Sequence, residues 1–129
     1  MERIERTALR NLIHNEEYSR KVLPFIKEDY FSDRLERLLF KEIYKFITKF
    51  NALPTKEALS IEINDSKDIN EDEYKKVTDI IATLNPEKIN LEWLVETTEK
   101  FCKDRAIHNA ILSGIQIIDG KDKKHTPEY

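Results

Sequence analysis

Glycine is scarce in this chain, and its scarcity limits the folds that the chain can form. Only Gly114 and Gly120 occur, and no Asn-Gly or Asp-Gly pair stands between two alternating apolar runs, where such a pair would close a tight β-hairpin. Apolar residues instead recur at intervals of three and four, as at Ile4, Ala8 and Leu12, which is the period of an amphipathic α-helix. The sequence therefore predicts an all-α fold.

Side chains that accept hydrogen bonds precede the periodic segments and mark where helices begin. Such side chains can cap the free amides of a first helical turn, and they occur at Asn15, Ser32, Thr55, Asn70 and Asn90. Asn70 and Glu73 also have the spacing of a capping box. We predict a small bundle of about six helices, at residues 3–14, 16–29 with a break or kink at Pro24, 33–51, 56–64, 71–84 and 91–118.

The length of 129 residues fits one domain with its own core. We expect a globular helical head at residues 1–90, a projecting helix at 91–118 and a polar connection at 119–129. The last helix would span roughly 42 Å at 1.5 Å per residue, which is longer than a small bundle needs. This length and the polar ending lead us to expect that the chain is cut from a longer protein.

Charge and cysteine content exclude several classes of protein. The net charge is −3, from 22 basic and 25 acidic residues, so no overall positive field draws the chain to nucleic acid or to anionic lipid. Cys102 is the single cysteine, which excludes an internal disulfide and a thiolate zinc site and fits a reducing cytoplasm. No apolar run approaches the 18 or so residues of a membrane span, so we expect no membrane association.

No motif predicts catalysis, a bound metal or a nucleotide. The three histidines, His14, His108 and His125, lack the spacing of metal ligands, and no glycine-rich loop ending in Gly-Lys-Ser or Gly-Lys-Thr is present. Glu28 and Asp29 are adjacent carboxylates, but adjacent helical residues do not face each other. We therefore expect that this stretch of sequence is not an enzyme by itself and holds no cofactor or metal.

The helix predicted at 33–51 has an apolar half and a basic half. The apolar half is expected to be buried by several neighbouring helices and contains Leu35, Leu39, Phe40, Ile43, Tyr44, Phe46, Ile47 and Phe50. The basic half contains Arg34, Arg37, Lys41, Lys45 and Lys49. Such a stripe is more often a solvated face, whose stems cover apolar surface, than a contact for an acidic partner or a phosphate backbone.

Two aromatic residues, Tyr30 and Phe31, precede this helix. A hydrophobic residue before a helix cap commonly packs back onto the first turn, so we favour packing over a role as a ligand platform. If the basic half does bind, the alternative function of the chain is a free-standing helical adaptor or DNA-binding module that uses this face.

A second candidate surface lies on the last helix. Small and branched apolar residues, which let another helix approach closely, form a broad strip of Ala106, Ile107, Ala110, Ile111, Gly114, Ile115 and Ile118. The strip is expected to need a partner if the helix projects from the head. Packing on the domain's own helices remains open for the first half of this helix and is disfavoured beyond about residue 106.

Five segments occur in an order that matches a known family: "NLIHN", "KEDYF", "LERLLFKEIYKFI", "FNALPTKEAL" and "LEWLVETTEKFCKDRAIHNAI". This order resembles the amino-terminal domain of DnaB-type replicative DNA helicases, most closely the form carried by T-even-like tailed phages. The likeness covers roughly residues 1–118. None of the segments is as specific as a P-loop, so the resemblance rests on the order and spacing of the whole set.

The resemblance implies a role in DNA replication, in the cytoplasm of the bacterial host. The chain would be the collar domain of a ring-shaped hexameric helicase that moves along single-stranded DNA, with residues 91–118 as the first arm of a helical hairpin that pairs subunits. Its implied partners are other helicase subunits, primase and a helicase loader. The second arm and the ATPase domain, with its ATP and Mg²⁺, would follow this sequence, and the oligomeric state without them stays open.

Overall fold

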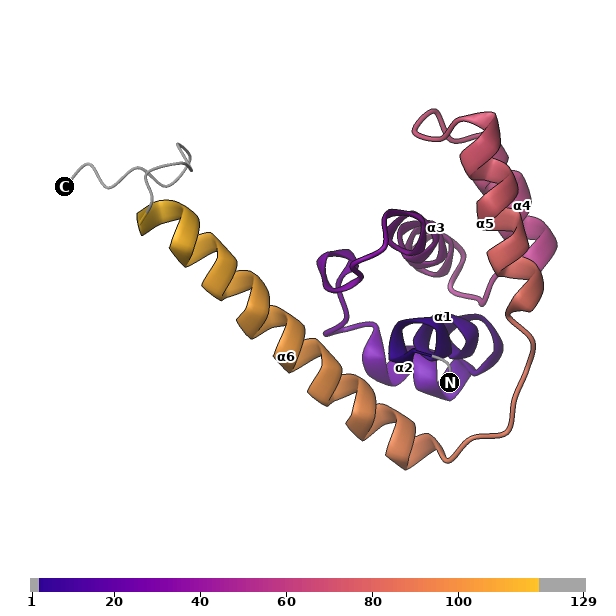
Figure 1. Cartoon of the computed structure of the whole chain (residues 1–129). Helices are drawn as coiled ribbons and strands as arrows, with labels where there is room; N and C mark the ends of the chain where they lie inside the picture. The colour runs from indigo at the N-terminus through magenta and orange to yellow at the C-terminus, as the bar shows by residue number, and fades with distance from the viewer. Residues whose placement is uncertain (1–2, 119–129) are drawn as a thin grey trace.

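The computed structural model describes residues 3–118, and in the last helix it describes side chains only as far as Ile115. Every regular element among these residues is helical (Figure 1): α1 (Ile4–His14), α2 (Glu16–Val22), the 3₁₀ helix η1 (Glu28–Tyr30), α3 (Arg34–Phe50), α4 (Lys56–Asn64), α5 (Glu71–Thr83) and α6 (Leu91–Ile118). The predicted all-α fold and its long C-terminal helix are confirmed. The connection expected at 119–129 lies outside the described residues.

Helix α3 occupies the centre of the head. It packs against α1 and also against the α4–α5 pair, while α6 packs along α2, α1 and η1. Figure 1 shows the α4–α5 pair on the side of α3 away from α6, and it shows the second half of α6 extending past the other helices. The core includes Leu9, Leu39 and Ile43, which are fully buried, and also Leu94. The first half of α6 therefore contributes to the core of the head.

Most helix starts lie where the sequence predicts them, because each cap is a local contact. The side-chain oxygens of Asn15, Thr55 and Asn90 accept hydrogen bonds from the amides three residues later, at 3.1, 3.0 and 2.8 Å. Asn70 and Glu73 form the predicted capping box, with both reciprocal bonds present. Each cap of this kind contributes about 1 kcal/mol.

The cap predicted at Ser32 is wrong by one residue. Asp33 caps α3, and its Oδ1 accepts hydrogen bonds from the amides of Leu35 at 2.7 Å and Glu36 at 3.3 Å. A carboxylate at this place also interacts favourably with the positive end of the helix dipole. The backbone carbonyl of Ser32 instead accepts a hydrogen bond from Arg37, at 2.9 Å.

The helix predicted at 16–29 is shorter than expected. Helix α2 ends at Val22 and is followed by a turn, and only Glu28–Tyr30 regain helical geometry, as the 3₁₀ helix η1. Pro24 has no amide hydrogen, and its ring clashes with the carbonyl four residues earlier in a continuous helix. The proline therefore ends the helix rather than kinking it.

The expectation that neighbouring helices bury the apolar half of α3 is also wrong in part. Leu39 and Ile43 are buried completely, but Tyr44 and Phe50 are 42% and 52% exposed. The rings of Phe46 and Phe50 lie against each other near the C-terminal end of α3, with centroids 4.7 Å apart. Helical periodicity identified the apolar half correctly, but the neighbouring helices do not cover its whole length.

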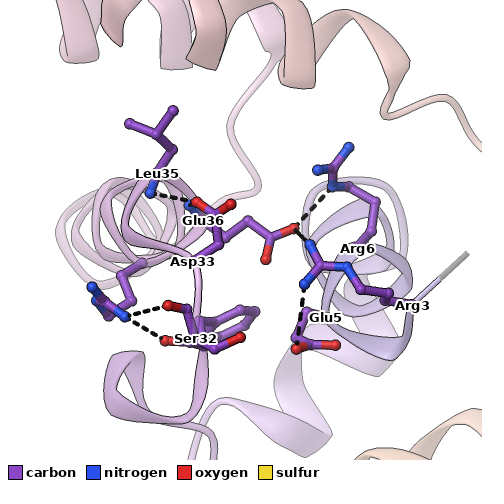
Figure 2. Close-up of polar contacts among 9 residues, drawn as sticks. Arg3, Glu5, Arg6, Ser32, Asp33, Leu35 and Glu36 are labelled. Carbon is purple, nitrogen blue, oxygen red and sulfur yellow. Dashed lines mark hydrogen bonds and ion pairs between the residues drawn. The ribbon is translucent and has the colours of Figure 1, made fainter.

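A buried carboxylate joins α3 to the start of the chain (Figure 2). Glu36 is fully buried, and its Oε2 accepts hydrogen bonds from Nη2 of Arg3 at 2.7 Å and from Nε of Arg6 at 3.1 Å. Its other oxygen, Oε1, has no hydrogen-bond partner among the described residues. Two arginines of the α1 segment therefore compensate one carboxylate that is removed from water.

Polar contacts fix the direction in which α6 leaves the head. The hydroxyl of Tyr18 in α2 and that of Thr98 in α6 form a buried hydrogen bond of 2.8 Å. Further along α6, Nδ2 of Asn109 donates to the carbonyl of Asp29 at 3.2 Å. The connection before α6 is held by Asn11, whose Nδ2 donates to Glu87 at 3.2 Å. These contacts give the projecting helix a defined orientation.

Candidate functional site

Helix α6 has one face against the head and one face away from it. Leu94, Thr98 and Cys102 are buried at intervals of four residues, so they lie on the same side of the helix. Ile107 comes nine residues after Thr98, which is about two and a half turns at 3.6 residues per turn. Ile107 therefore lies opposite the face that contacts the head, and Ile111 and Ile115 follow it on that outer side.

The outer side of α6 exposes large apolar groups. Ile107, Ile111 and Ile115 are 59%, 57% and 48% exposed. Within residues 3–115, Asn109 is the last α6 residue with a hydrogen bond to the head. We call Ile107, Ile111 and Ile115 the outer stripe of α6. Branched side chains in one row at helical spacing form a surface that suits a second helix.

The other predicted members of this strip border the outer stripe. Ala106 and Ala110 are exposed and Gly114 is partly exposed. A Cβ added to Gly114 would meet no atom within 4 Å, so this glycine leaves room for close approach of another helix. The side chain of Ile118 lies outside the described residues. Whether the strip binds a subunit stays a prediction.

Two exposed residues of α6 were not singled out from the sequence. Leu112 is 47% exposed and Trp93 is 52% exposed. Trp93 comes fourteen residues before Ile107, about four full turns at 3.6 residues per turn, and so lies on the same outer side. That interval from the strip was the signal in the sequence that could have identified it.

The structure divides the predicted basic face into two parts. Arg34 donates to the carboxylate of Glu73 and to the carbonyl of Asp68, and Arg37 donates to the carbonyls of Phe31 and Ser32. These two arginines thus hold parts of the head together.

The remaining three residues, Lys41, Lys45 and Lys49, are exposed. Lys45 lies 3.5 Å from a carboxylate oxygen of Glu42, and Nζ of Lys49 lies 5.3 Å from the ring centroid of Phe50. Binding of an acidic partner or nucleic acid by this face stays a prediction. Within residues 3–115, the three lysines make no hydrogen bond to the backbone, whereas both arginines do, so the lysines are the groups of this face that a ligand could engage.

The packing interpretation of Tyr30 and Phe31 is confirmed for Phe31, which is fully buried. Its ring stacks on Phe40 with centroids 5.1 Å apart and meets the edge of Phe101 at 6.3 Å. Such aromatic pairs contribute about 0.5–1.5 kcal/mol beyond their buried area. Phe31 thereby connects α6 to α3, while Tyr30 is only partly buried.

The described residues contain no group of His, Cys, Asp and Glu side chains that could hold a metal ion. His14 is used structurally, with Nε2 2.7 Å from the carbonyl oxygen of Leu84. Burial raises the pKa of the Tyr18 phenol above its usual range, so this hydroxyl stays protonated next to Thr98. None of the helices described here has the length and apolar content needed to cross a membrane.

The Cys102 thiol is expected to react slowly in the folded chain. Burial raises its pKa from 9.0 to about 11, and the nearby Glu99 carboxylate acts in the same direction. At pH 8 the thiolate, which is the reactive form, is then about 100-fold rarer than in the unfolded chain. We expect Ellman's reagent to modify folded protein at least 100-fold more slowly than urea-unfolded protein.

The pH dependence gives a second check on the same thiol. The rate for folded protein should keep rising with pH up to about 11 instead of levelling off near 9.0. Between these pH values the unfolded thiol ionises first, so folding stability should decrease as pH rises through this interval. Equal rates for folded and unfolded protein at pH 8 would contradict the buried position of Cys102.

Comparison with models of known protein families finds no match for this chain. Among curated proteins, the chain is similar to a DnaB-like replicative helicase of Enterobacteria phage T4. The two sequences are 31% identical over 109 residues, which are 84% of this chain but only 23% of the phage protein. Over most of its own length the chain therefore resembles one segment of a DnaB-type replicative helicase of a T-even phage, as its sequence predicts.

Proposed function

We propose that the chain is the amino-terminal collar domain of a phage replicative DNA helicase. In this role α6 is the first arm of a helical hairpin that pairs subunits of a hexamer, and the head docks primase or a helicase loader at the replication fork. The observation that carries the proposal is the outer stripe of α6, a row of exposed isoleucines that faces away from the head. Similarity to part of a phage helicase supports the same role.

Pairing through the outer stripe would be driven by removal of apolar surface from water. Complete burial of one isoleucine side chain contributes about 1.5–3 kcal/mol. Gly114 and Ala110 beside the stripe are small enough to let two helix backbones approach closely. A hydrogen bond of 2.8 Å between the hydroxyls of Tyr18 and Thr98 holds α6 against the head. Pairing of two α6 helices would therefore also set the orientation of the two heads.

The collar itself contributes no catalytic group in this proposal. ATP and Mg²⁺ would be bound by an ATPase domain that follows this sequence in the parent protein, and that domain would make the main contacts with single-stranded DNA. The role of the collar is then to hold subunits in a ring and to increase the local concentration of partner proteins.

The proposal is tested first by reading the source gene beyond the codon for Tyr129. We expect codons for a second helical arm and then, within roughly the next hundred codons, a P-loop of the form GxxxxGK[ST]. A stop codon soon after Tyr129 would overturn the helicase assignment. The exposed lysines of α3 would then support the alternative, a separate adaptor or DNA-binding module.

A further inference from the structure

A groove lies between the segment that follows α2 and one side of α3. Its volume is about 540 Å³, within the range of about 300–1,000 Å³ that is typical of ligand pockets. One wall is made by Leu23, Pro24 and residues 26–29, in the segment that follows α2, and the other is made by the middle of α3, including Phe40 and Tyr44. The groove is formed by the head, separately from the outer stripe of α6.

The floor of the groove is apolar and rests on the core. Ile26 and Phe40 line it and are each 3% exposed, while the ring of Tyr44 remains 42% exposed. Phe40 stacks on the buried Phe31, and the centroids of Phe40 and Tyr44 are 6.1 Å apart. Because the aromatic residues are supported from below, the floor is formed before any ligand arrives and requires little ordering on binding.

The rim of the groove has an excess of positive charge. Lys27, Lys41 and Lys45 line it, and all three are exposed. Lys45 forms one ion pair, in which its Nζ lies 3.5 Å from Oε1 of Glu42. Neither Lys27 nor Lys41 has an ion pair among the described residues. Their ammonium groups are available to a ligand.

Carboxylates also line the groove, at Glu28 and Asp29 in η1. A nucleic-acid backbone, with one phosphate for each nucleotide, would be repelled by these groups as it passed through. A peptide can avoid the repulsion, because it can place carboxylates near the lysines and another residue near η1.

We propose that this groove binds an acidic peptide segment of a partner protein, with one aromatic or leucine-sized side chain as its anchor. The anchor packs on the exposed ring of Tyr44, above the nearly buried Phe40, and acidic residues beside the anchor form charge-assisted hydrogen bonds with Lys41, Lys45 and Lys27. The inference rests on the proposed docking role of the head, and it gives that role a location and a ligand chemistry. It does not depend on pairing through α6.

The test uses the chain and a short fluorescein-labelled peptide in which a Phe-Leu pair follows a run of Asp and Glu and is itself followed by uncharged residues. We expect micromolar binding by fluorescence anisotropy. Replacement of Phe-Leu by Ser-Ser, or of the acids by Gln, should each weaken binding at least tenfold. If the peptide does not bind, or if either altered peptide binds as tightly, the proposal is overturned.

Charge reversal locates the site. The double variant Lys41→Glu/Lys45→Glu should weaken peptide binding more than tenfold, because attraction at the rim becomes repulsion. Its control is Lys67→Glu/Lys88→Glu, which changes the net charge equally at exposed positions away from the groove and should bind as the original chain does. Equal losses in both double variants would indicate only a general charge effect and would overturn the proposal.

Single-stranded oligo-dT tests the competing ligand class. We expect it to bind at least tenfold more weakly than the acidic peptide. Tighter binding of oligo-dT, lost in Lys41→Glu/Lys45→Glu, would assign the groove to nucleic acid and overturn the peptide proposal. Sedimentation of the same samples reports pairing of α6 separately, so failure of the groove and failure of the proposed collar function are distinguishable.

Discussion

The substitution Ile111→Asp is expected to prevent hexamer assembly in a full-length protein that contains this domain. Ile111 lies in the middle of the outer stripe and is 57% exposed in the single chain. Its burial in a pair would contribute roughly 2 kcal/mol, and a symmetric pair contains the residue twice. Loss of both contributions weakens pairing roughly 1,000-fold, before the cost of burying two carboxylates is added. Sedimentation velocity would measure the loss of the hexamer.

The matched control for this prediction is Ile61→Asp. Ile61 is 62% exposed and lies on α4, on the side of the head away from α6 (Figure 1), so the same change of chemistry is made outside the outer stripe. We expect this variant to form hexamers and both variants to keep their helical circular dichroism. A normal hexamer from Ile111→Asp, or equal disruption by Ile61→Asp, would contradict the proposed interface.

Removal of both arginines that contact Glu36 is expected to give a large loss of stability. In Arg3→Ala/Arg6→Ala, the Glu36 carboxylate, which is 0% exposed, loses both of its described partners. It must then either stay charged without a partner or take up a proton, and both alternatives cost stability. Breaking a buried ion pair in this way typically costs about 3–5 kcal/mol. Because the Arg3 side chain is 49% exposed and partly screened by solvent, we expect a loss of about 3 kcal/mol in urea unfolding.

The triple variant Arg3→Ala/Arg6→Ala/Glu36→Met separates the buried charge from loss of arginine packing. Met is similar to Glu in shape and needs no hydrogen bond, so it should recover most of the stability. Arg20→Ala is the control, since Arg20 pairs with Glu16 at an exposed site and should change stability by less than about 1 kcal/mol. No recovery in the triple variant would show that desolvation of Glu36 is not the cause.

Features that depend on local contacts agree more closely with the sequence than features that depend on distant contacts. Asn70 and Glu73 cap α5 as their spacing predicts, because all the groups involved lie within one turn of chain. Asp33, and not Ser32, caps α3. Both side chains can accept a hydrogen bond from a first-turn amide, and the helical periodicity of the apolar residues does not decide between two adjacent positions. Pro24 ends α2 completely, and the sequence placed the break correctly while overestimating the helix that follows it.

The groove and the buried carboxylate were not evident from the pattern of residues. Tyr44 belongs to the apolar half of its helix, and it lines the groove because residues 23–29 leave it partly uncovered. Glu36 resembles any acid in a first helical turn, where a carboxylate commonly faces water. In the folded chain it is buried, and Arg6, 30 residues earlier in the sequence, donates a hydrogen bond to it.

The sequence by itself determined the helical class, most helix starts, the length of α6 and the apolar character of its outer stripe. These features depend on side chains within a few residues of each other. Only the tertiary structure decided that the outer stripe faces away from the head, that Arg34 and Arg37 are used internally and that a groove lies beside Tyr44. Periodicity shows which residues are apolar, but exposure depends on which distant helix packs over each residue.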